Sequence, residues 1–164
     1  RAAIFGFLNF ITRPLGGAIS DFLYAHPPTS KIQPLWYKKA WILSCGLLSG
    51  TILLILSRFA SVSSPSQATI VVLVVLAAVF LEAGNGANFS LLPHVHPEAN
   101  GLVSGFTGAA GNLGGVLFAI VFRSVGKSGP STGYANGFRV LGFVNLAICV
   151  AVGWTRPVPK LYGS

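Results

Sequence analysis

One arginine lies in the middle of the first apolar run of this 164-residue sequence. Arg13 is about ten residues from either end of that run, and an arginine at the centre of a membrane helix costs roughly 2.5–3.5 kcal/mol on insertion scales. A guanidinium is permanently charged and donates hydrogen bonds in a planar fork that matches small oxyanions. Arg13 therefore predicts oxyanion binding. The alternative is a structural arginine that binds carbonyl groups or a carboxylate inside a helix bundle.

The residues around Arg13 place polar and small side chains on one face of a helix. At about 100° per residue, Asn9, Arg13, Gly17 and Ser20 fall within an arc of about 80°. Asn9 is therefore a second candidate contact for a bound anion. Pro14 lacks a backbone N–H, so we expect the helix to kink beside Arg13.

The stretch from Gly101 to Gly115 holds six glycines in fifteen residues and runs directly into an apolar segment. Each glycine costs a soluble helix about 1 kcal/mol relative to alanine, whereas in a membrane small residues let helices approach closely. Most of these glycines share one face with a single amide. The strip consists of Gly101, Gly105, Gly108, Asn112 and Gly115, with Gly111 at its border. It predicts tight helix packing, a small-solute site, or both.

Two acidic residues fall in or beside apolar runs. Glu82 lies in the second half of one run, near Asn85 and Asn88. A carboxyl group at membrane depth is a candidate proton carrier or ion-pair partner, and a hydrogen-bonded structural glutamate is the equal alternative. Asp21 lies near a predicted helix end, where we expect it to pack against the terminus of a neighbouring helix.

Several kinds of chemistry find no support in the sequence. His94, His96 and Glu98 lie in a short proline-rich connector, which indicates a loop or cap and no metal site. Neither a Ser–His–Asp order, nor paired carboxylates, nor a phosphate-binding loop is present, so we predict no enzyme and no cofactor. The net charge of +8 comes from scattered Lys and Arg. Without a basic stripe, it does not indicate nucleic-acid binding.

The composition is that of an integral membrane protein. Hydrophobic residues make up 52% of the chain and charged residues 9%, whereas soluble domains are about 25% charged. A membrane span needs roughly 20 mostly apolar residues. Five runs meet this requirement, at residues 2–23, 39–59, 68–92, 101–122 and 137–154. Short polar connectors between them predict an all-α, multi-pass helix bundle. Cys45 and Cys149 fall inside these runs and are predicted to be free, buried thiols.

Lys and Arg are balanced five against five between the two sides of such a bundle, so their number does not orient it. The compact pair Lys38 and Lys39 favours a cytoplasmic position for the first connector.

Three segments resemble the nitrate/nitrite porter family of the major facilitator superfamily, most closely its eukaryotic, fungal-type branch. They are FGFLNFITRPLGGAISD, GNGANFSLLPHVHPEANG and GLVSGFTGAAGNLGG. Within the last, GAAGNLGG is similar to the family's nitrate signature on its eleventh helix. The resemblance covers most of the chain. It implies that residues 1–164 form part of the C-terminal six-helix half of a twelve-helix transporter, about helices 8–12.

The resemblance also implies roles for individual residues. Arg13 matches the substrate-binding arginine of that half, and Asn112 matches the signature asparagine near the anion. Asn9, Gly108 and Gly111 join them as expected substrate contacts. Packing or gating roles are expected for Gly17 and Asp21, which match the start of the superfamily's cytoplasmic loop motif, and for Gly101, Gly105 and Gly115. The basic residues that follow Asp21 in that motif are absent here.

The expected function is transport of nitrate, and of nitrite, across the plasma membrane by alternating access. The expected partners are the anion, protons, the lipid bilayer and the N-terminal half of the transporter. Glu82 is the candidate for proton coupling. Two alternatives stay open: a transporter of another small solute on the same fold or, for these residues alone, a helix-packing module that does not transport.

Overall fold

Five long α-helices form the described part of the chain, which comprises residues 2–62, 66–95, 97–125 and 130–157 of a computed structural model. They are α1 (Ala2–Ala25), α2 (Pro34–Ala60), α3 (Gln67–Val95), α4 (Asn100–Val125) and α5 (Pro130–Gly153), and a short 3-10 helix, η1 (Pro97–Ala99), precedes α4. No strand occurs among these residues. The prediction of an all-α fold is confirmed.

Each predicted apolar run lies almost entirely within one helix, but the helices extend beyond the runs. α2 begins at Pro34 and not at residue 39, and α5 begins at Pro130 and not at residue 137. Proline suits the first turn of a helix, where its missing N–H is not needed. The first turns of α2 and α5 are too polar to count as membrane-spanning sequence. Hydropathy therefore predicts that these helices begin several residues after their actual starts.

Four segments are long and apolar enough to cross a membrane by length and composition, among the residues described. They are Pro34–Ala60, Gln67–Val95, Pro97–Val125 and Gly133–Gly153. The first helix, α1, carries the polar residues Asn9, Arg13 and Asp21 within its apolar sequence. α1 therefore depends on neighbouring helices to separate these polar groups from lipid.

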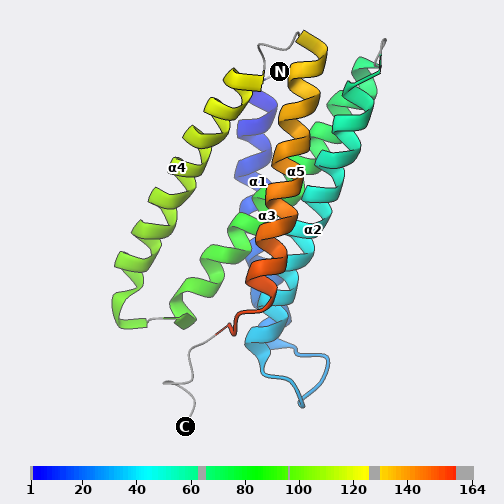
Figure 1. Cartoon of the computed structure of the whole chain (residues 1–164). Coiled ribbons are helices and arrows are strands. Elements are labelled where there is room, and N and C mark those ends of the chain that lie inside the picture. The colour runs from blue at the N-terminus through cyan, green and yellow to red at the C-terminus, as the bar shows by residue number, and fades with distance from the viewer. Residues whose placement is uncertain (1, 63–65, 96, 126–129, 158–164) are drawn as a thin grey trace.

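Glycines set the distances between the packed helices. α1 packs along α3, while α2 packs against both α3 and α5. A Cβ atom added to Gly50 would lie 2.9 Å from the Leu146 side chain. One added to Gly142 would lie 2.7 Å from the Leu54 side chain. A Cβ atom at either site would force a leucine side chain to move, so glycine lets α2 and α5 approach closely. α4 stands to one side of this bundle (Figure 1).

Two adjacent lysines join the helix ends at one end of the bundle. The Lys38 ammonium is buried and lies 2.5 Å from Asp21 Oδ1 and 2.9 Å from the Ser90 carbonyl oxygen. The Lys39 ammonium donates to the carbonyl oxygens of Gly153 and Thr155 at the C-terminal end of α5. A cation beside the free carbonyls of a helix C-terminus is stabilising. The lysine pair therefore connects α2 to α1, α3 and α5.

Candidate functional site

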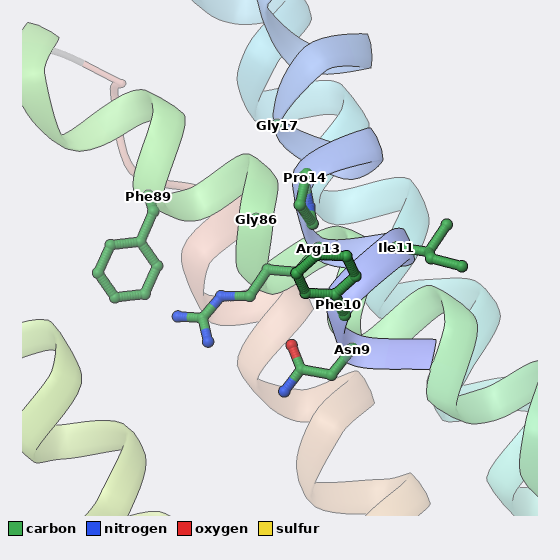
Figure 2. Close-up of a pocket in the computed structure, with 8 residues that line it drawn as sticks. All are labelled: Asn9, Phe10, Ile11, Arg13, Pro14, Gly17, Gly86 and Phe89. Carbon is green, nitrogen blue, oxygen red and sulfur yellow. The ribbon is translucent and has the colours of Figure 1, made fainter. Parts of the chain in front are cut away.

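Arg13 lines an open pocket between α1 and α3, which we call the Arg13 pocket (Figure 2). Its volume is about 750 Å³. Six of its residues come from α1 and two from α3: Asn9, Phe10, Ile11, Arg13, Pro14, Gly17, Gly86 and Phe89. The walls are mostly apolar, and Arg13 and Asn9 supply the polar side chains. Asn9, Arg13 and Gly17 of the predicted polar face of α1 thus line this pocket, whereas Ser20 does not.

The Arg13 side chain rests against an aromatic ring and keeps its donors free. Its guanidinium carbon lies 4.9 Å from the centre of the Phe89 ring. Figure 2 shows the side chain leaving α1 on the side where Asn9 and Phe89 also lie. A cation this close to a ring face is attracted to it. Within the described ranges, Arg13 forms neither an ion pair nor a side-chain hydrogen bond, so its N–H groups are available to a ligand.

The main chains of α1 and α3 touch directly beside Arg13. A Cβ atom on Gly86 would overlap the carbonyl oxygen of Arg13, and one on Gly16 would overlap the backbone of Ala83. One on Gly17 would lie 3.4 Å from the Gly86 oxygen, an ordinary contact. Gly86 therefore sets the position of Arg13 relative to α3.

Two hydrogen bonds fix α1 against its neighbours near this crossing. The Ser90 and Ser20 hydroxyl oxygens are 2.8 Å apart, and Ser20 is fully buried. The Trp41 indole donates to the Gly16 carbonyl oxygen at 3.1 Å. Hydrogen bonds between membrane helices contribute about 0.6–2 kcal/mol each. α1 thus presents Arg13 from a fixed position on α2 and α3.

The glycine strip of α4 does not take part in the Arg13 pocket. Asn112 and most of the glycines are exposed, and Gly108 is half-buried. No described atom lies within 4 Å of a Cβ added to Gly101, Gly105, Gly108, Gly111 or Gly115. The structure therefore brings Arg13, Asn9 and Gly17 together, and it leaves the predicted contacts on α4 apart from them.

Comparison with known proteins gives a consistent set of relatives. Elsinochrome transporter 1 of Elsinoe fawcettii is 46% identical over 160 residues, which cover 97% of this chain. Nitrate transporter 2.1 of Chlamydomonas reinhardtii is 32% identical over 89% of the chain. High affinity nitrate transporter 2.5 of Arabidopsis thaliana is 32% identical over 92% of it. Over most of its length, the chain is thus homologous to nitrate/nitrite transporters of the major facilitator superfamily.

The chain spans about a quarter of the length of these transporters, at 28%, 25% and 27% respectively. No family model matches the sequence. No solved structure matches it either. The transporter relatives and the apolar helices together show an integral, multi-pass membrane protein.

Asp21 and Glu82, two of the three acidic residues of the chain, lie in different surroundings. Glu82 Oε2 is buried on α3 and has no hydrogen-bond partner in the described part of the chain. Glu82 precedes Gly86 by four residues and Phe89 by seven, so all three share one face of α3. The Asp21 side chain is 63% exposed and pairs with Lys38 at the end of the bundle. Neither acid lines the Arg13 pocket.

Among residues 2–62, 66–95, 97–125 and 130–157, no three His, Cys, Asp or Glu side chains are grouped as metal ligands. His96 lies outside the described residues.

Sequence reasoning missed Gly86 and Phe89 as parts of the pocket. Both belong to α3, and their position beside Arg13 depends on how α1 and α3 align along their lengths. No local pattern encodes that alignment. The one available signal was the i, i+4 spacing of Glu82 and Gly86, which marks a face of α3.

Proposed function

We propose that the complete transporter moves nitrate and nitrite across the plasma membrane, and that Arg13 is the main anion contact in this chain. One observation carries the proposal. The Arg13 guanidinium lines an open, mostly apolar pocket and has no carboxylate partner among the described residues. A charge in such surroundings is costly until an ion of opposite sign pairs with it. The names of the two nitrate transporters among the relatives support nitrate as that ion.

The pocket suits a small planar oxyanion. Arg13 can donate two parallel hydrogen bonds to two oxygens in the plane of its guanidinium. The Phe89 ring lies beside the guanidinium, with its centre 4.9 Å from the guanidinium carbon, and takes none of the N–H donors. The Asn9 amide lines the same pocket and supplies a further donor. The apolar walls keep the local dielectric constant low and thereby strengthen these interactions.

In this proposal α4 forms another part of the anion site in the complete protein. Asn112, Gly108 and Gly111 would contact the anion from a second wall, while Gly101, Gly105 and Gly115 would pack against helices outside this chain. Transporters of this superfamily bind their substrate between two halves that rock about it. Gly17 and Asp21 would serve the packing and gating of that movement. The 164 residues alone would pack as helices without transporting.

We also propose that Glu82 carries the coupled proton. Its Oε2 atom is buried and lacks a protein partner among the described residues. A carboxyl group of this kind at membrane depth is a candidate proton carrier. Glu82 shares a face of α3 with Gly86 and Phe89, so a change in its charge would alter the electrostatic potential next to the Arg13 pocket.

The test of the anion site is nitrate uptake by cells that express the complete transporter and lack other nitrate uptake. Arg13→Lys keeps the charge but loses the planar fork, so we expect the apparent affinity for nitrate to fall at least about tenfold. Arg139→Lys is the matched control, since Arg139 is exposed on α5 and lies outside the pocket. Affinity near that of the parent for Arg13→Lys would contradict the proposal.

A second candidate substrate is elsinochrome. The relative named for it is 46% identical to this chain, against 32% for each of the two nitrate transporters. The pocket volume of about 750 Å³ also leaves room for a solute much larger than nitrate. Uptake of each compound by the same cells separates the candidates. Elsinochrome transport without nitrate transport would replace the first proposal with the second.

A further inference from the structure

A second pocket lies among α2, α3 and α5, away from Arg13. Its volume is about 350 Å³, and its lining combines apolar side chains with a hydroxyl and three carboxamides. The four polar groups belong to Ser49 of α2, Asn85 and Asn88 of α3, and Asn145 of α5. We call this pocket the asparagine chamber. It shares no lining residue with the Arg13 pocket.

Helix periodicity places the chamber and the Arg13 pocket on different faces of α3. At about 100° per residue, Asn85 and Asn88 lie about 60° apart, and Gly86 and Phe89 also lie about 60° apart, on a neighbouring face. Gly86 and Phe89 line the Arg13 pocket, whereas Asn85 and Asn88 line the chamber. α3 therefore separates two polar regions in the bundle.

Asn145 is held in one orientation at the wall of the chamber. Its amide nitrogen donates to the Gly46 carbonyl oxygen at 3.1 Å and to the Ser49 hydroxyl oxygen at 2.8 Å. A carbonyl oxygen only accepts hydrogen bonds, so the amide nitrogen faces α2. Asn145 Oδ1 is then left as an acceptor for another group.

The two asparagines of α3 lack partners of this kind. The Asn85 and Asn88 side chains form no hydrogen bonds with the part of the chain that is described, and Asn85 is exposed. Each carboxamide has two N–H donors and one acceptor oxygen. Hydrocarbon cannot form hydrogen bonds with these groups, whereas water can form hydrogen bonds with all of them.

Glycine keeps the chamber open. A Cβ atom on Gly46 would overlap the Cys149 sulfur, and both residues line the chamber. One on Gly84, another lining residue, would lie 3.2 Å from the Cβ atom of Cys45. The space therefore depends on glycine from both α2 and α3.

We propose that the asparagine chamber binds water at membrane depth, as a hydrated compartment separate from the anion site. A buried water needs about 30 Å³ and two to four polar partners, and the chamber supplies four polar side chains around about 350 Å³. None of its lining side chains is ionisable apart from the Cys149 thiol, so an anion finds no counter-charge there. A lipid chain would leave the carboxamides without hydrogen bonds. Water can satisfy the four polar groups of the lining.

The chain carries a natural probe for this proposal. Cys149 lines the chamber, while Cys45 does not line it and is 0% exposed. Both are free thiols, as the sequence predicted. The complete transporter in membrane vesicles is treated with a charged methanethiosulfonate, and modified cysteines are identified by mass spectrometry. We expect Cys149 to react at least about tenfold faster than Cys45, because only Cys149 meets water.

A matched pair on α5 provides the second measurement, in a Cys149→Ser background. Ile148 lines the chamber and is 54% exposed, whereas Val150 is 72% exposed and does not line it. The charged reagent should modify Ile148→Cys and spare Val150→Cys, and Asn85→Leu should slow the reaction at position 148.

Two outcomes would overturn the proposal. If Cys149 and Ile148→Cys resist the charged reagent but react with a lipid-soluble maleimide, lipid fills the chamber. If they resist both reagents, protein covers it. The readout is labelling and not uptake, so this result is independent of whether the transporter carries nitrate.

Discussion

Replacing Gly86 with alanine tests how the structure holds Arg13 in place. A Cβ atom on Gly86 would overlap the carbonyl oxygen of Arg13. Backbone atoms cannot rotate out of the way as a side chain can, so α1 and α3 must move apart. That movement would carry Arg13 away from Phe89, and the guanidinium would lose its support in the pocket.

The size of the effect follows from two opposing terms. Overpacking a close contact costs about 1–3 kcal/mol, and a backbone contact lies at the upper end of that range. Gly86→Ala also raises helix propensity by about 1 kcal/mol. The expected net loss of stability is therefore about 2 kcal/mol, or roughly 30-fold in the folding equilibrium.

Gly17→Ala is the matched control for Gly86→Ala. The new Cβ atom would lie 3.4 Å from the Gly86 oxygen, an ordinary contact at the same crossing. Thermal stability of the detergent-solubilised transporter, followed by fluorescence-detected size exclusion, gives the readout, together with nitrate uptake. We expect Gly86→Ala to lower both and Gly17→Ala to leave stability near that of the parent. If Gly86→Ala is as stable as the parent, the close contact between Gly86 and Arg13 does not exist. If Gly86→Ala and Gly17→Ala lose the same stability, the close contact is not located at Gly86.

Three further predictions concern other polar residues. Glu82→Gln should abolish the pH dependence of nitrate uptake in the complete transporter, and unchanged proton coupling would remove Glu82 from the mechanism. Asp21→Asn should lower thermal stability more than Lys38→Met, because it leaves a buried cation without its counter-ion, whereas Lys38→Met leaves only an exposed carboxylate. The reverse order would contradict this reading of the pair. Asn145→Leu should lower thermal stability by about 1–2 kcal/mol through two lost hydrogen bonds while nitrate affinity stays unchanged. A loss of affinity without a loss of stability would instead give Asn145 a role in transport.

Contacts within one helix were predictable from the sequence. Asn9, Arg13 and Gly17 line one pocket because helix periodicity places them on one face. Here the chemistry and spacing of one segment sufficed.

Contacts between helices were not predictable in the same way. Phe89 lies against Arg13, and Lys38 pairs with Asp21, only because the helices align as they do. The alignment of α1 with α3 follows from the close crossing at Gly86, where main-chain shape and not side-chain chemistry decides. A basic residue that directly follows Asp21 would have been visible in the sequence, but Lys38 reaches it from α2.

The glycine strip of α4 differs from the glycines at the helix crossings, because no described helix packs against it. Gly16, Gly50, Gly86 and Gly142 each lie where a Cβ atom would collide with a neighbouring helix. The strip residues Gly101, Gly105, Gly108, Gly111 and Gly115 meet no described atom within 4 Å. At about 1 kcal/mol of helix propensity for each glycine, an unpartnered strip is costly for α4. The relatives are about four times as long as this chain. We therefore expect the partner of the strip in the remainder of the transporter. Gly108→Ala should then lower nitrate uptake by the complete transporter, even though the described contacts leave room for alanine.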